Sequence, residues 1–295
     1  VHYLNYYREY NIYKKLVKET WYNKKDVSIR NFVYQYDDNQ NLLQEKETYP
    51  TGFDAVINYH FNDEDLLESS LKYFSDPGFF YYDDYIYDDQ KRLIEIKSFN
   101  HDGELSGKKL TYNPNRKLVK LFEHSPYILV PSEGKSILSK RDKEGQDLLN
   151  EEYSYTEFDS ISEIKYYKQD FVDPNKRFLY NKVIYNYDTQ KRKAVEYHYS
   201  LESLLSTVNF KYYPGNLIEE INYSSVNNSS TYKYFYNKDG FISKVIFVTN
   251  KKTTILEFKY VFDQNNNWIQ QEKSVDNVAL YRRTRDIEYY SAKMN

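Results

Sequence analysis

The stretch Tyr85–Glu95 reads YIYDDQKRLIE, and its pattern recurs through the chain. The pattern begins with two aromatic residues separated by one residue. After them come an acid or Asn, a few turn residues and a pair of Leu or Ile residues. We take the second aromatic as the anchor of the motif. Anchors lie at positions 36, 61, 87 and 112, and again at 187, 212, 236 and 262, with steps of 24 to 26 residues. A fixed period of this length is typical of a repeat architecture.

Within each repeat the hydrophobic period is two. Tyr232, Tyr234 and Tyr236 alternate with other residues, which predicts a strand with one face more buried than the other. Turn signals such as Asp239-Gly240 separate the strands. The sequence therefore predicts an all-β fold: an antiparallel meander of about ten hairpins, in a long twisted or curled sheet. We expect residues 1–295 to form a single elongated domain.

The composition agrees with this fold. The chain has 36 Tyr, 17 Phe and 2 Trp but only 4 Ala. Aromatic residues favour strands and Ala favours helices, so this composition favours strands. Two segments give a competing helical signal. Asn62–Leu71 has helical spacing, but its Leu pair falls in the repeat register and we expect a strand there. Ser200–Leu205 could form a single helical turn. The charged stretch 131–152 lacks aromatics and is predicted to be an insertion or flexible loop.

Several classes of function are excluded by the same residues. The absence of Cys excludes disulfide scaffolds, thiolate zinc sites and cysteine nucleophiles. No apolar stretch is long enough for a transmembrane span. Val1–Tyr10 lacks a signal-peptide run, so we expect any export signal or lipid anchor to lie outside this sequence. A net charge of −3 and a pI near 6.1 argue against nucleic acid as a partner.

At Tyr85–Asp88 and its equivalents the sequence resembles the YD-repeat, or RHS-like, family of bacterial proteins. In that family Tyr-x-Tyr-Asp followed by Gly-Arg/Asn-Leu marks successive β-hairpins. Asn100–Lys108 is also similar to the short repeats of MORN-like proteins. In the RHS family the strands coil into a shell that can enclose a toxic C-terminal domain, and an Asp-Pro- and Gly-rich cleavage motif follows; this sequence lacks that motif. The resemblance implies a bacterial β-repeat scaffold, envelope-associated or secreted.

Paired acids occur where the repeats turn, as at Asp37-Asp38 and Asp88-Asp89. Two close carboxylates can serve glycoside hydrolysis or bind Ca²⁺. Their recurrence at the same point of successive repeats favours a structural role, because Asp bonds to its own backbone in turns. The five histidines have no metal-ligand spacing. We therefore expect no catalytic residue, no metal and no cofactor.

Aromatic and basic residues near the C-terminal end are the candidates for binding. Trp268 could stack on a sugar ring, and the run Tyr281, Arg282, Arg283 and Arg285 could recognise an anionic glycan or a protein partner. The alternative is structural, since charges on a terminal strand also block aggregation at a sheet edge.

Three hypotheses of function follow. The first is a non-enzymatic β-repeat scaffold that binds protein partners in a bacterial cell-envelope or secretion-associated assembly, because repeat proteins present extended binding surfaces. The second is a glycan-binding module that uses an aromatic sheet face. The third is a glycoside hydrolase.

Overall fold

The computed structural model of the chain describes residues 5–75, 80–100, 103–124, 127–132, 135–140, 147–170, 172–173 and 176–289. The described residues divide into two compact units. The first unit takes residues up to 152 together with 168–178, and the second takes 153–167 together with residues from 179 onward. The prediction of a single elongated domain over 1–295 stays a prediction.

Every regular element in the described residues is a β-strand. The strands are β1 (Tyr6–Tyr10), β2 (Leu16–Tyr22), β3 (Ser28–Tyr36), β4 (Leu42–Thr48), β5 (Asp54–Phe61), β6 (Leu67–Phe74), β7 (Phe80–Tyr87), β8 (Leu93–Asn100), β9 (Gly103–Tyr112), β10 (Leu118–His124), β11 (Tyr127–Ser132), β12 (Lys135–Lys140), β13 (Leu148–Tyr155), β14 (Ile161–Gln169), β15 (Arg177–Tyr187), β16 (Lys193–Ser200), β17 (Ser203–Tyr212), β18 (Ile218–Ser225), β19 (Ser229–Tyr236), β20 (Ile242–Thr249), β21 (Thr253–Phe262), β22 (Trp268–Val275) and β23 (Val278–Thr284).

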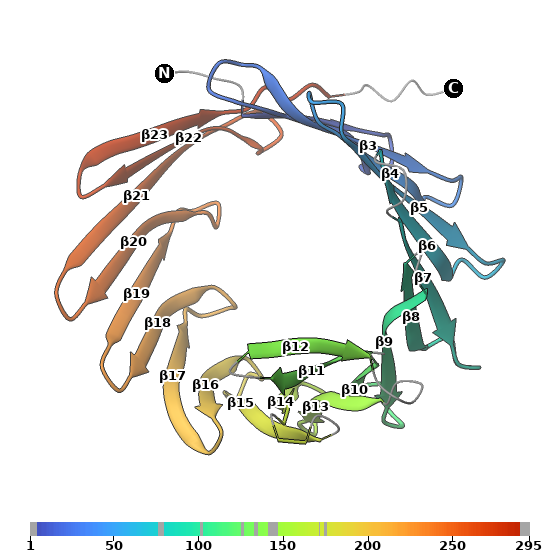
Figure 1. Cartoon of the computed structure of the whole chain (residues 1–295). Helices are drawn as coiled ribbons and strands as arrows, with labels where there is room; N and C mark the ends of the chain where they lie inside the picture. Colours follow the sequence, from blue (N-terminus) through green and yellow to red (C-terminus); the bar gives the residue numbers. More distant parts are fainter. Residues whose placement is uncertain are drawn as a thin grey trace. The chain divides into compact units, whose positions relative to one another are not determined.

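The strands form antiparallel meanders, which confirms the predicted fold class. In the first unit β1 to β10 pair in chain order. In the second unit β15 to β23 do the same. Strands β11 and β12 pair with each other as a separate sheet. In Figure 1 the direction of the strands changes gradually from one strand to the next within each unit, as expected for a twisted sheet.

The anchor aromatic of each repeat lies at an irregularity of the strand pairing. The register shifts between Gln35 and Tyr36, between Ile86 and Tyr87, and again beside the anchors 61, 187, 212, 236 and 262. A β-bulge redirects the side chain at the extra residue. The periodic aromatic is therefore tied to a periodic change of backbone direction.

Five-residue loops close the hairpins at the anchor side. In the loop 37–41, the N–H of Asp37 donates to the carbonyl of Asn41, and the N–H of Gln40 donates to the carbonyl of Asp37. The fourth loop residue has a positive φ, as in Gln40 at 67° and Gly240 at 80°. Most repeats use a residue other than Gly at this position, so other contacts must hold the loop.

Little of either unit is fully buried. Among the described residues, the buried apolar side chains are only Phe32, Ala55, Val56, Leu148, Val183 and Val245. A single sheet layer leaves both of its faces in partial contact with water. Tyrosine suits such a surface, because its ring packs against neighbouring strands while its hydroxyl finds a polar partner.

Neither of the two segments with a helical signal forms a helix in the structure. Asn62–Leu66 is a turn and β6 begins at Leu67, as the repeat register predicts. The prediction of a helical turn at Ser200–Leu205 is wrong. Ser200 pairs with Ser203 across a tight turn at Leu201 and Glu202, and Leu201 has a φ of 53°. Within 131–152 the structure describes β12 and the first part of β13, whereas 133–134 and 141–146 lie outside the described residues. The predicted insertion or loop stays a prediction.

Candidate functional site

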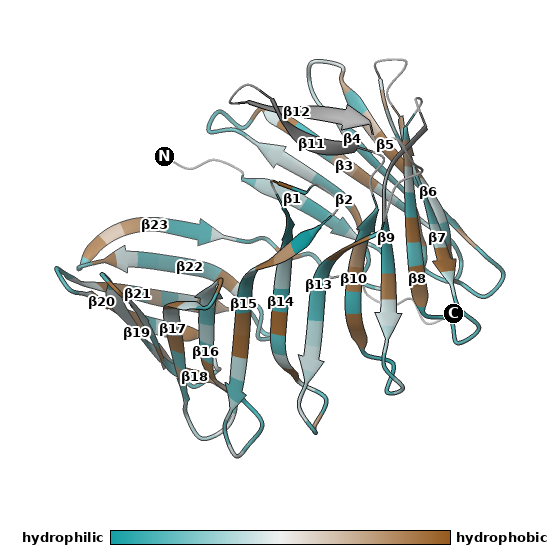
Figure 2. Cartoon of the chain, turned by 60° about the horizontal axis from the view of Figure 1, so that its bottom comes forward, coloured by the Kyte–Doolittle hydropathy of each residue, from teal (hydrophilic) through white to brown (hydrophobic). Residues whose placement is uncertain are grey.

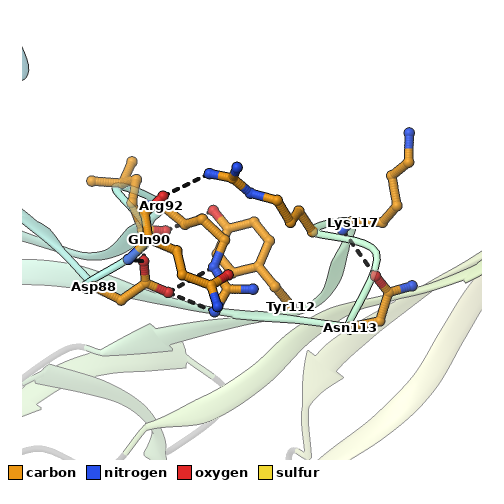
Figure 3. Close-up of polar contacts among 8 residues, drawn as sticks. Asp88, Gln90, Arg92, Tyr112, Asn113 and Lys117 are labelled. Carbon is orange, nitrogen blue, oxygen red and sulfur yellow. Dashed lines mark hydrogen bonds and ion pairs between the residues drawn. The ribbon is translucent and has the colours of Figure 1, made fainter.

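The acid that directly follows the anchor, as at Asp88, is engaged by its own loop (Figure 3). Asp88 Oδ1 accepts the backbone N–H groups of Gln90 at 2.9 Å and Arg92 at 3.0 Å. Its Oδ2 accepts Nε of Arg92 at 2.6 Å. The Arg92 side chain, helped by these N–H groups, lowers the pKa of Asp88. This carboxylate holds a turn in which Lys91 has a φ of 61°.

The second unit repeats this arrangement one hundred positions later. Asp188 Oδ1 accepts the N–H groups of Gln190 and Arg192 at 2.8 and 2.9 Å, and its Oδ2 accepts Arg192 Nε at 2.8 Å. The Arg192 guanidinium lies 4.4 Å from the ring centre of Tyr212. Burial opposes ionisation of Asp188, but the Arg192 hydrogen bonds outweigh it and lower the pKa of this carboxyl. The turn acids therefore have the structural role that their recurrence predicts.

The anchor tyrosines link each repeat to the one before it. Tyr36 donates its hydroxyl hydrogen bond to the carbonyl of Leu16 at 2.9 Å, where the second strand of the preceding hairpin begins. The same link recurs in both units: Tyr87 to Leu67, Tyr112 to Leu93, Tyr187 to Ile161, Tyr212 to Lys193 and Tyr236 to Ile218. In the repeat whose anchor is Phe262, Tyr260 two positions earlier donates to the carbonyl of Ile242 instead. These hydroxyls serve the architecture.

Burial also disfavours ionisation of the inner tyrosine hydroxyls. It raises the pKa of Tyr34 and of Tyr185 to about 12 in each case. A shallow cavity of about 270 Å³ lies beside Tyr185, lined also by Ser160, Ile161, Tyr187 and Lys193. The Nζ of Lys193 lies 4.6 Å from the ring centre of Tyr185 and pairs with Glu196 at 2.6 Å.

The structure brings Trp268 and Arg285 together. The guanidinium carbon of Arg285 lies 3.6 Å from the ring centre of Trp268, and Arg285 Nε donates to the Trp268 carbonyl at 2.7 Å. That carbonyl occupies the repeat position at which Leu16 and its equivalents accept an anchor tyrosine. One face of the Trp268 ring is therefore covered by Arg285.

Tyr281 and Arg283 lie on the same sheet face as Lys273. Residues directly opposite on antiparallel strands share a face. Lys273 pairs in register with both Phe258 and Tyr281, and its Nζ lies 5.8 Å from each ring centre. Arg283 pairs with Gln271, and its guanidinium lies 4.9 Å from the Tyr281 ring. We call Trp268, Lys273, Tyr281, Arg283 and Arg285 the β23 patch.

Arg282 is separated from this group. It alternates with Tyr281 and Arg283 along β23 and pairs with Glu272 on β22, with Nε to Oε1 at 2.8 Å. By contrast, no carboxylate among the described residues forms an ion pair with Lys273, Arg283 or Arg285. The nearby acid Glu272 faces the other side of the sheet, where it pairs with Arg282. Within the part of the chain that the structure describes, the β23 patch therefore carries three cations beside two aromatic rings without a neutralising acid.

The outer edge of β23 is open within the described residues, where it pairs only with β22. Arg285 donates its backbone N–H to the carbonyl of Ile269, which marks that pair as hydrogen-bonded. Hydrogen-bonded and non-hydrogen-bonded pairs alternate in an antiparallel ladder. The backbone N–H and C=O groups of Arg282 and Thr284 therefore point away from β22.

The described residues contain no group of three or more His, Asp or Glu side chains placed to hold a metal ion. In the same part of the chain, no helix has the length and apolarity to cross a membrane. Sequence reasoning missed Lys273, which shares its sheet face with Tyr281 only through the register of β22 and β23.

The chain was compared with known proteins. No family model matches it, and no curated protein matches it. Among solved structures, it is similar to a Photorhabdus luminescens Tc holotoxin pore carrying the mutation TccC3-D651A, with 10% identity, a TM-score of 0.35 and coverage of 88% of this chain and 16% of that one. It is also similar to a porin-like protein from Bacteroides uniformis, with 11% identity, a TM-score of 0.28 and coverage of 91% and 86%. Because both TM-scores are below 0.5, neither similarity assigns a family or a function to this chain.

Proposed function

We propose that the chain is a non-enzymatic β-repeat scaffold that binds a protein partner in a bacterial cell-envelope or secretion-associated assembly. The observation that carries this proposal is the open, basic edge of β23. The turn acids and the anchor hydroxyls support it, since Asp88 and Tyr36 are already engaged in repeat contacts. The groups left for recognition include arginine and aromatic side chains, which are enriched at protein interfaces.

Site-specific photo-crosslinking tests the proposal. A photoreactive residue replaces Leu280, which is 60% exposed on β23, and in a matched variant it replaces Leu205, which is 49% exposed on β17. We expect a defined protein of the native cell envelope to crosslink at Leu280. That protein, purified separately, must then bind the unmodified chain in solution.

Two outcomes contradict the scaffold. One is the absence of any crosslinked protein that binds again after purification. The other is turnover of a glycan by the purified chain, lost when a turn carboxylate is replaced.

Binding of a glycan is the second candidate, and the cavity beside Tyr185 favours it. Aromatic rings beside a few convergent polar groups are common in small-ligand sites. On a glycan array, Tyr185→Ala should then remove binding. Binding unchanged by Trp268→Ala would place the sugar at the cavity, and loss of binding in Trp268→Ala alone would place it at the β23 patch.

A further inference from the structure

We propose that the free edge of β23 binds an extended, acidic segment of the partner protein, which adds to the second unit as a further antiparallel strand. The inference rests on the proposed function and names the chemistry of the partner. Three observations on β23 carry it: the direction of its backbone groups, the unpaired cations on one face, and the exposed apolar residues at its start.

The backbone provides the docking groups. Arg282 and Thr284 direct their N–H and C=O groups away from β22, as the Arg285–Ile269 bond requires. An added strand would satisfy these groups with main-chain hydrogen bonds. Its side chains would then alternate between the two faces of the sheet in register with β23.

Charge selects the occupant. On the face of the β23 patch, Lys273 and Arg283 lie near the free edge without a carboxylate of their own among the described residues. On the other face, Arg282 is already paired with Glu272 at 2.8 Å. The partner residue opposite Arg283 is therefore Asp or Glu, since complementary charge sets specificity and speeds association.

The order of acidic and apolar residues in the partner strand follows from the hydropathy of β23. β23 begins with exposed apolar residues, Val278 at 70% and Leu280 at 60%, and ends with Arg282, Arg283 and Thr284. Figure 2 shows this change from apolar to hydrophilic along β23. An antiparallel partner would thus place its acids first and its apolar residues after them.

Fluorescence anisotropy with a labelled synthetic peptide tests the proposal. The peptide has two alternating Glu residues followed by two alternating Val residues, separated by Thr. We expect saturable binding to the full chain that weakens as salt is added. Arg283→Glu should weaken binding by about tenfold or more, whereas Lys251→Gln, which removes a cation from an exposed loop, should leave it unchanged.

Proline separates strand addition from simple charge attraction. Thr284→Pro removes one outward N–H, and an edge strand tolerates proline at such a position. We expect this variant to keep the far-UV circular dichroism of the parent and to lose peptide binding by about tenfold. Thr284→Val keeps the N–H and should bind normally. N-methylation of the peptide nitrogens that face β23 should abolish binding, and methylation of the other set should not.

Three outcomes overturn the strand-addition proposal. Thr284→Pro could bind the peptide as well as the parent, which would leave charge alone as the cause. Polygalacturonate could bind the patch while the peptide does not, which would make the ligand a polysaccharide. Sedimentation could show a dimer of the chain that Thr284→Pro dissociates, which would make a second copy of the chain the occupant of β23. A partner that crosslinks at Leu205 and still binds Thr284→Pro would refute this inference while supporting the scaffold.

Discussion

Two edge regions, one in each unit, are built from similar residues and differ in their charge pairing. In the first unit, β1–β3 hold Trp21 with the Arg30 guanidinium 5.1 Å from its ring centre. In the second, β21–β23 hold Trp268 with the Arg285 guanidinium at 3.6 Å. Both regions end in a strand that pairs on one side only among the described residues.

The first region neutralises its cations. Arg8 pairs with Glu19 at 2.8 Å, and Glu19 is only 7% exposed. Arg30 pairs with Glu47, and its guanidinium hydrogen bond lowers the pKa of that carboxyl. The exposed Lys18 pairs with Glu9 at 3.2 Å. The β23 patch has the same types of cation and aromatic residue, but among the described residues no acid pairs with Lys273 or Arg283, so these two cations are available to a ligand.

The first prediction concerns stability at the two edges. Arg30→Ala removes the partner of Glu47 and contacts with the rings of Trp21, Phe32 and Tyr49. We expect the free energy of unfolding of the first unit to fall by about 3 kcal/mol. Arg283→Ala loses only an exposed contact with the Tyr281 ring, so the free energy of unfolding of the second unit should fall by less than about 1 kcal/mol.

Each unit contains one Trp, which makes this comparison measurable. In Trp268→Phe, urea unfolding followed by fluorescence reports on Trp21 and the first unit; in Trp21→Phe it reports on Trp268 and the second. Equal effects of the arginine changes in their own units would refute the distinction between paired and unpaired edges.

The second prediction concerns Glu220, a carboxylate of the second unit that pairs with two lysines away from the β23 patch. Glu220 on β18 is 12% exposed and contacts Lys211 at 3.0 Å and Lys233 at 3.3 Å. The hydrogen bond from Asn222, with those from both lysines, lowers the pKa of Glu220 from 4.5 to about 2. A carboxyl whose pKa is lower in the folded state than in the unfolded state stabilises the fold at pH values above its unfolded pKa. This stabilisation is lost as the pH falls through the folded pKa.

We therefore expect Glu220 to contribute about 2 kcal/mol at neutral pH, after allowance for the exposed lysines. This contribution should disappear between about pH 4.5 and 2 and be absent at all pH values in Glu220→Gln. Unfolding by urea at a series of pH values, with Trp268 as the reporter, measures it. A pH profile shared by the parent and Glu220→Gln would contradict the assignment.

The third prediction compares the acceptor carbonyls of the two regions. The Leu16 carbonyl accepts the Tyr36 hydroxyl at 2.9 Å, whereas the Trp268 carbonyl accepts Arg285 Nε at 2.7 Å. Tyr36→Phe and Arg285→Leu should each lower the stability of their own unit by about 1 kcal/mol. Urea unfolding with the two single-Trp variants checks this. No loss in Arg285→Leu would mean that Arg285, like Arg283, is free for a ligand.

Much of this architecture was predictable from the sequence. The period of the anchors predicted the hairpins, and the recurrence of acids at the turn predicted the role of Asp88. Ser200–Leu205 misled because its polar residues and leucines fit a helical turn, whereas Leu201 adopts a positive φ in a tight strand connection. The contacts of the β23 patch depend on register: Arg285 reaches Trp268 from 17 positions away, and no spacing in the sequence indicates it.

The last prediction converts one type of edge into the other. Gln271 pairs in register with Arg283 and donates to the Tyr260 hydroxyl at 3.2 Å. Gln271→Glu gives Arg283 a carboxylate directly across the strands, as Glu19 gives one to Arg8. Because a cross-strand ion pair contributes a few tenths of a kcal/mol, we expect stability to rise by about 0.5 kcal/mol relative to Gln271→Met, which controls for the lost hydrogen bond. The new acid should also weaken binding of the acidic peptide, because Arg283 is then neutralised within the chain. If Gln271→Glu and Gln271→Met bind the peptide equally, the charge of Arg283 does not select the ligand, and the contrast between the two edges concerns stability alone.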